Sequence, residues 1–139
     1  EHMIEHISYQ DGLAMLKECH RVLKSNGKIR ISTPDLRFLI GLYQDDKSEL
    51  QTEYINYSQG SYPYPDATFV INNFFRGFGH LFIYDEKILR SSMKTAGFTN
   101  ITKLGLNESK DVALQHLENE KRMPSGFLKL ETFTLEATK

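Results

Sequence analysis

The stretch LKECHRVLKSNGKIRISTPDL, residues 16–36, contains the end of a helix, a turn and a short strand. Apolar residues at helical spacing predict one amphipathic helix over residues 9–24. Gly27 follows, and glycine readily adopts the positive φ that commonly ends a helix. Alternating isoleucines predict a strand over residues 28–33, which Pro34 ends because proline has no N–H to donate to a sheet. This order is typical of the second half of a βαβ unit and predicts an α/β fold.

The rest of the chain is predicted to form further helices and strands separated by polar turns. Helices are expected over residues 35–57 (one or two, with a break at 45–48), 68–75, 85–96 and 111–119, and strands over 99–106 and 128–138. In the last strand, Leu128 and Leu130 share one face, whereas Phe133 and Leu135 share the other. A bulge, or a strand buried on both faces, accounts for this change.

The composition is that of a single ordinary globular domain of 139 residues. A formal net charge of -1, with both signs mixed along the chain, gives no electrostatic reason to expect nucleic acid or an anionic membrane as a partner. Cys19 is the one cysteine, so no disulfide forms within the chain, and no segment is long and apolar enough to span a bilayer. The first residues do not have the pattern of a signal peptide, and we expect a cytoplasmic location.

Three segments together resemble the class I S-adenosylmethionine-dependent methyltransferases of the type-11 group. The first is EHMIEHIS at residues 1–8, followed by a Leu-x-Glu-x-x-Arg-Val-Leu-Lys run at residues 16–24. The second is GHLFIYDEKILRSSMKTAGF at residues 79–98, in which a histidine and an aromatic-Asp pair precede a helix that ends in Ala-Gly-Phe. The third is the last pair of strands, which is similar to the family's antiparallel hairpin. The chain departs from the family at residues 25–27, where Ser-Asn-Gly replaces the usual Pro-Gly-Gly.

The resemblance implies a partial Rossmann-like methyltransferase fold. Residues 1–139 are expected to form a single, incomplete domain, the C-terminal half of that fold with strand five and the antiparallel six–seven hairpin, and residues 35–84 a substrate-side insertion. The family binds S-adenosyl-L-methionine at a glycine-rich turn after its first strand, and Gly77 and Gly79 follow no clear strand. We expect the complete protein to methylate an unidentified small-molecule acceptor, and this chain alone to bind the cofactor weakly or not at all and to be inactive.

The cofactor side of the site is expected near the start of the chain. Ligands of doubly wound sheets bind beyond the carboxyl ends of the parallel strands. The resemblance implies that His2 and Met3 lie beside the methionine part of the cofactor, with Glu5 and His6 at the next turn. A purely structural role for Glu5 and His6, in which they cap and anchor the following helix, stays open.

His80 is the candidate catalytic residue, because the region between strands five and six supplies the acceptor pocket in this family. An imidazole of near-neutral pKa suits a group that accepts a proton from the attacking nucleophile. Asn73, Arg76 and Tyr84 are the candidate acceptor-binding residues. Simpler roles stay open: a histidine that hydrogen-bonds a loop, a solvated arginine, and aromatic residues that pack in the core.

Two other classes of function also stay open. Residues 2–6 match the H-x-x-E-H spacing of inverted zinc peptidases, and on a helix His2 and His6 would share a face, as two zinc ligands must. No third ligand helix is recognisable, so no metal is expected. The other class is a non-catalytic, dimeric interaction module that retains the methyltransferase scaffold, since a fold does not fix a function.

The strand at residues 28–33 suggests how copies of the chain associate. In the family it pairs with a preceding strand, most of which is not found in this sequence. An exposed apolar strand edge readily pairs with another chain. We therefore expect a homodimer or a swapped assembly that covers the edge of residues 28–33.

Overall fold

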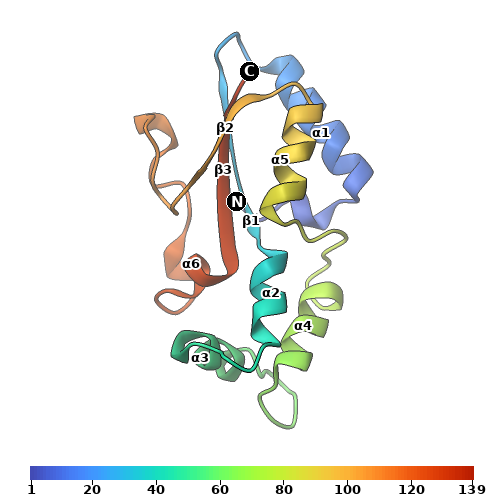
Figure 1. Ribbon diagram of the computed structural model, residues 1–139, viewed down its shortest axis with the longest axis vertical. Helices are drawn as coiled ribbons and strands as arrows, with labels where there is room; N and C mark the ends of the chain where they lie inside the picture. Colours follow the sequence, from blue (N-terminus) through green and yellow to red (C-terminus); the bar gives the residue numbers. More distant parts are fainter.

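A computed structural model describes the whole chain, residues 1–139. The chain folds into one three-stranded sheet, six α-helices and three short 3-10 helices (Figure 1). The strands are β1 (Lys28–Pro34), β2 (Thr99–Leu104) and β3 (Thr132–Thr138). The α-helices are α1 (Tyr9–Val22), α2 (Leu36–Leu42), α3 (Glu49–Tyr57), α4 (Ala67–Arg76), α5 (Glu86–Thr95) and α6 (Phe127–Glu131), and the 3-10 helices are η1 (Ile4–His6), η2 (Val112–Leu114) and η3 (Glu120–Arg122).

Side-chain caps set the starts of α1 and α5. The Ser8 hydroxyl accepts the backbone N–H of Asp11 at 3.2 Å, and the Asp85 carboxylate accepts that of Ile88 at 2.7 Å. Such caps satisfy N–H groups of the first turn, which have no partner inside the helix. After α5, Gly97 has a φ of +105°, which glycine adopts without strain. Both helices are confirmed close to their predicted boundaries.

The predicted break in the segment 35–57 is also confirmed. The helix α2 stops at Leu42, and Ser48 begins α3 with a capping box in which it and Gln51 satisfy each other's backbone N–H groups. The helix expected over residues 68–75 corresponds to α4, which Asp66 caps. The helices α2, α3 and α4 thus fill the segment 35–84 that precedes α5.

The sheet has the strand order β1-β3-β2, and the central strand β3 is antiparallel to both neighbours. Lys28 lies opposite Thr138 and Pro34 opposite Thr132, so β1 pairs with β3 along its full length. The mixed α/β class and the antiparallel pairing of the last two strands are confirmed. The sheet contains no parallel pair: β1 pairs with the antiparallel β3 on one side and has no strand on the other.

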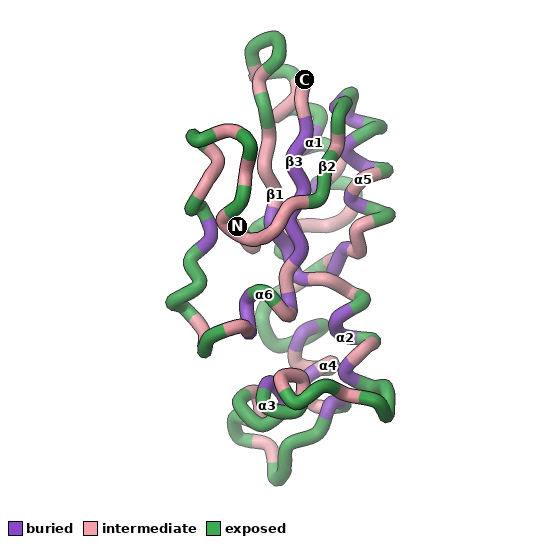
Figure 2. Tube along the Cα trace, turned by 60° about the vertical axis from the view of Figure 1, so that its left-hand side comes forward, coloured by how far each residue is buried: buried purple, intermediate pink, exposed green.

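Two hydrophobic clusters divide the molecule. In the first, α1 and α5 pack on the face of the sheet that carries Phe133, Leu135 and Ala137 (Figure 1). Figure 2 shows β3 as a buried strand between β1 and β2. In the second cluster, α2, α3, α4 and α6 pack together beyond the Pro34 end of β1. None of these helices has both the length and the apolar composition that crossing a membrane requires.

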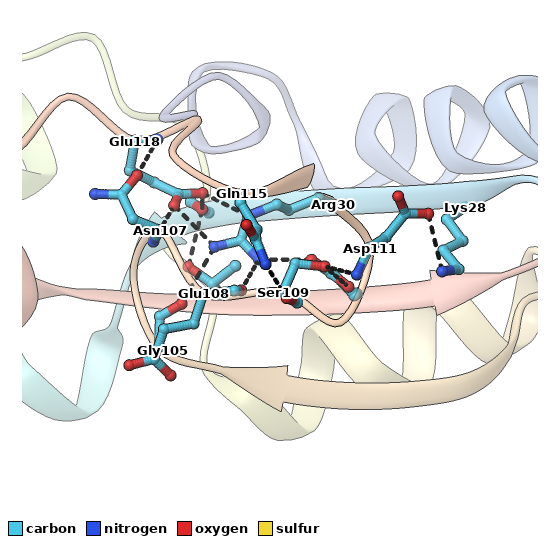
Figure 3. Close-up of polar contacts among 12 residues, drawn as sticks. Lys28, Arg30, Gly105, Asn107, Glu108, Ser109, Asp111, Gln115 and Glu118 are labelled. Carbon is cyan, nitrogen blue, oxygen red and sulfur yellow. Dashed lines mark hydrogen bonds and ion pairs between the residues drawn. The ribbon is translucent and has the colours of Figure 1, made fainter. Parts of the chain in front are cut away.

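The segment 111–119 differs from the predicted helix. Only Val112–Leu114 form a 3-10 turn, and the remainder follows the sheet as an irregular loop. The Arg30 side chain, 3% exposed, extends from β1 into this loop and binds Glu118 (Figure 3). It also pairs with Glu136 of β3. The prediction was wrong because these contacts between distant segments determine the path of the loop, whereas helical propensity is only a weak preference.

The last predicted strand is also shorter than expected. Residues 127–131 form α6, and β3 begins at Thr132. Leu128 therefore belongs to the short helix, and Phe133 and Leu135 belong to the strand. The change of face along this segment marks the junction of a helix and a strand. Within β3 every residue from Phe133 to Ala137 is buried, so the expected burial on both faces is confirmed for the strand itself.

Candidate functional site

A cavity of about 750 Å³ lies beside the second hydrophobic cluster, at the Pro34 end of β1. The N-terminal turn, α3, α4 and the segment that leads into α6 supply its walls. Its polar lining includes His2, Glu5, His6, Asn73, His80, Arg122 and Glu131. The cavity thus lies beyond the carboxyl end of β1, where ligands of α/β proteins commonly bind.

The Glu5 carboxylate is fully buried at the base of this site. Its Oε2 accepts a hydrogen bond from the Thr33 hydroxyl at 2.9 Å, whereas its Oε1 has no hydrogen-bond partner. The Oε1 atom lies 3.6 Å from Nδ1 of His2 and 3.9 Å from Nε2 of His6. Because buried polar atoms are nearly always paired in folded proteins, an unpaired carboxylate oxygen identifies a position of functional interest.

His80 lies beside this carboxylate, with its ring centroid 4.8 Å from that of His6. Its Nδ1 is 2.7 Å from the carbonyl oxygen of Phe74. Since a carbonyl only accepts hydrogen bonds, Nδ1 carries the proton, and the lone pair of the neutral ring is on Nε2. Burial lowers the pKa of His80, although the Phe74 carbonyl and Glu5 act in the opposite direction.

His2, which also lies near the Glu5 carboxylate, is held in place by polar contacts of its ring nitrogens. Its Nε2 lies 2.8 Å from the Thr132 hydroxyl, and a guanidinium nitrogen of Arg122 lies 3.0 Å from the same ring atom. Burial lowers the pKa of His2 to about 3, and the positive charges of Arg122 and the N-terminus add to this effect. The ring is therefore neutral at physiological pH.

A buried pair of a tyrosine and a glutamate, which sequence reasoning missed, completes the site. The Tyr54 hydroxyl donates a hydrogen bond to Glu131, and Arg122 lies 3.4 Å from the same carboxylate. Burial raises the pKa of Glu131, although the Tyr54 hydrogen bond and the Arg122 charge lower it. The only signal in the sequence was an acidic residue inside an apolar segment, and the wrong assignment of that segment to a strand hid it.

The structure brings most of the predicted site residues together. His2, Glu5, His6, Asn73 and His80 all line the cavity.

Three of the predicted residues do not line the cavity. Met3 and Arg76 are exposed outside it. Tyr84 is fully buried in the first hydrophobic cluster, where its hydroxyl has no hydrogen-bond partner and lies against Gly12. Its burial raises the pKa of Tyr84 to about 12.

The arrangement of residues 2–6 differs from the helix that an inverted zinc peptidase needs. Only Ile4–His6 form a turn, of the 3-10 type, and His2 precedes it with a φ of +49°. The two histidines lie on either side of Glu5, and His6 faces His80 instead.

The fold is similar to that of part of a known enzyme. The crystal structure of a SAM-dependent methyltransferase from Archaeoglobus fulgidus superposes on this chain with a TM-score of 0.52 and 13% sequence identity. The match covers 100% of this chain and 57% of that one, so the chain spans just over half the length of that methyltransferase. At this identity the likeness shows a shared fold. No protein-family model and no curated protein matches the sequence.

Proposed function

We propose that this chain binds the acceptor of an S-adenosylmethionine-dependent methyl transfer and accepts the proton that the acceptor loses. The proposal is supported by the likeness of the whole chain to part of a SAM-dependent methyltransferase. It is also supported by a cavity of about 750 Å³, a size typical of small-molecule sites. The observation that carries it is the position of His80 in the wall of that cavity.

His80 is suited to act as the base. The Phe74 carbonyl holds the proton on Nδ1, which leaves Nε2 free to accept one. The lowered pKa keeps the ring neutral at physiological pH. When an acceptor hydroxyl or amine attacks the methyl group, its proton moves to Nε2 of His80. Asn73, which directly precedes Phe74 in α4, lines the same cavity and supplies an amide that orients the acceptor.

The cofactor supplies an electrophilic methyl group, whose transfer breaks a carbon–sulfur bond. On this chain, His2 is the residue of the cavity wall that faces the cofactor in our proposal. A glycine cradle for the cofactor is not found among these residues. Gly105 is the glycine that directly follows a strand, β2, but it packs against the Glu108 carboxylate, and its carbonyl accepts a hydrogen bond from Arg30. The residues described here therefore fit the acceptor side of the reaction and only the edge of the cofactor site.

Replacement of His80 tests the proposal. In the complete protein, assayed with tritiated S-adenosylmethionine and a panel of small hydroxyl and amine acceptors, His80→Gln should lower kcat by about a hundredfold or more and change KM little. In the unchanged protein kcat should fall on the acid side, as His80 becomes protonated, and this limb should disappear in the variant.

The exposed His116 provides the control, since His116→Asn should leave kcat unchanged. An unaltered kcat in His80→Gln would exclude a base role for His80. Acceptor binding without any methyl transfer would instead favour a non-catalytic interaction module.

A further inference from the structure

The unpaired Oε1 atom of Glu5 is the starting point for a second proposal. Its side chain is 0% exposed, and Thr33 satisfies only the other carboxylate oxygen. Burial of an ionised carboxylate is unfavourable unless a hydrogen bond or a cation compensates for the lost water. Oε1 lies beside the cavity with no hydrogen donor in range, so a cation bound there would complete its environment.

Two imidazoles face the same position. One ligand atom each from Glu5, His6 and His80 lies within 4.8 Å of the others. His80 is already oriented as metal-bound histidines usually are, since its Nδ1–H donates to a backbone carbonyl and its Nε2 keeps the lone pair. His2 is also close to Oε1, but its contacts with Thr132 and Arg122 occupy its ring nitrogens.

We propose that Glu5, His6 and His80 bind one zinc-class divalent metal ion at the wall of the cavity. Two histidines and one carboxylate are a ligand set that holds Zn²⁺ and leaves at least one coordination position for water or substrate. Imidazole ligands favour such a transition-metal ion over Mg²⁺ or Ca²⁺, which prefer oxygen. The open position faces the cavity, because all three residues line it.

Modest movement brings the ligands to metal-binding distance. Zinc ligands lie about 2.0–2.2 Å from the ion, so they must be closer to one another than the 4.8 Å seen here. Glu5 is fixed in the core, but the His6 side chain is 41% exposed, and His80 follows the exposed residues 77–79. The two rings therefore have room to turn toward Oε1. Arg122 pairs with Glu1 and Glu131, which offset its charge.

Metal binding goes beyond the proposed methyl transfer and does not depend on it. With an ion bound, Nε2 of His80 becomes a ligand, and the ion itself lowers the pKa of a coordinated acceptor hydroxyl, which releases its proton to water. Without the ion, His80 accepts that proton directly. The ion can be detected without any methyl transfer, so failure of one proposal is distinguishable from failure of the other.

Titration with Zn²⁺, and with Co²⁺ as a coloured substitute, tests the site. We expect the purified protein to bind one equivalent of each ion in calorimetry. His6→Ala and His80→Ala should each weaken binding by at least about tenfold. The control His116→Asn removes an exposed histidine at a positive φ that asparagine tolerates, and it should leave the affinity unchanged. Failure to bind either ion at micromolar concentration, or equal affinity in all four proteins, would overturn the proposal.

A measurement on the unchanged protein covers the possibility that a variant does not fold. Bound Co²⁺ is paramagnetic, so it should shift or broaden the NMR signals of the His6 and His80 rings. The rings of His20, which packs on Phe98, and of exposed His116 should keep their signals. Perturbation of the His20 or His116 rings without that of His6 and His80 would place the ion elsewhere and contradict the assignment.

Discussion

Arg30 and Glu118 show how much one pair of residues decides in this chain. The guanidinium makes two hydrogen bonds to Glu118, of 2.7 and 2.8 Å, and one of 2.6 Å to Glu136 (Figure 3). Ser32 and the backbone N–H of Asn107 donate to Glu118 as well. Burial by itself raises the pKa of Glu118, but these hydrogen bonds outweigh it and lower the pKa to about 2.

This lowered pKa predicts a loss of stability in acid. Glu118 binds protons more weakly in the folded chain than in the unfolded one, so its stabilising effect is complete above about pH 5 and is lost as the pH falls toward 2. Between pH 7 and pH 3, the free energy of unfolding should fall by about 2 kcal/mol more in the unchanged protein than in Glu118→Gln. Urea titrations at both pH values measure this difference. Equal losses in the two proteins would show that Glu118 does not have a lowered pKa.

Among the elements, the edge strand β1 has a partner strand on one side only, as β2 has at the opposite edge of the sheet. It pairs with β3 on one side. On its other side it makes one backbone hydrogen bond, in which the His2 N–H donates to the Ser32 carbonyl oxygen at 2.8 Å. An edge strand with free backbone groups readily pairs with another strand. We propose that two copies of the chain associate through this edge.

The β1 edge gives a direct prediction about association. Sedimentation equilibrium should show a dimer that dissociates on dilution. Arg30 is two residues from Ser32, so its amide points to the same outer edge of β1. Hydrogen exchange at this amide should slow as the dimer forms. A buried amide of β3 such as that of Leu135 serves as the control, since its exchange should not depend on concentration. A monomer at all concentrations would rule the association out.

At the scale of the whole molecule, the cavity lies where the N-terminal turn and the Pro34 end of β1 meet the second hydrophobic cluster. The sheet, α1 and α5 form one cluster, and α2, α3, α4 and α6 form the other. The wall residues come from positions as far apart as His2 and Glu131. Of the two clusters, only the second supplies residues of the wall, so the cavity depends on how the N-terminal turn is placed against that cluster.

The absence of a glycine cradle among these residues predicts weak cofactor binding. Calorimetry with S-adenosylmethionine should give a Kd well above the micromolar range for this chain, because the backbone contacts that hold the nucleotide part are not supplied here. S-adenosylhomocysteine should behave in the same way. Micromolar affinity for either compound would show that other residues replace the cradle. This result would not bear on the metal site, which has its own ligands.

The sequence by itself determined the helices α1 and α5, the strand β1 and the turn at Gly97, because helical spacing, capping residues and alternating isoleucines act over a few neighbouring residues. The positive φ expected at Gly27 was wrong, since Asn26 has it instead. The family resemblance also implied that Glu5 and His6 lie on the cofactor side of a site and His80 in its acceptor pocket.

Only the tertiary structure decided the loop around Glu118, the short helix α6 and the burial of Tyr84 in the core. It also showed that the oxygen left unpaired on Glu5 faces two histidines. These features depend on contacts between residues far apart in the chain, and local patterns do not record which distant groups will meet.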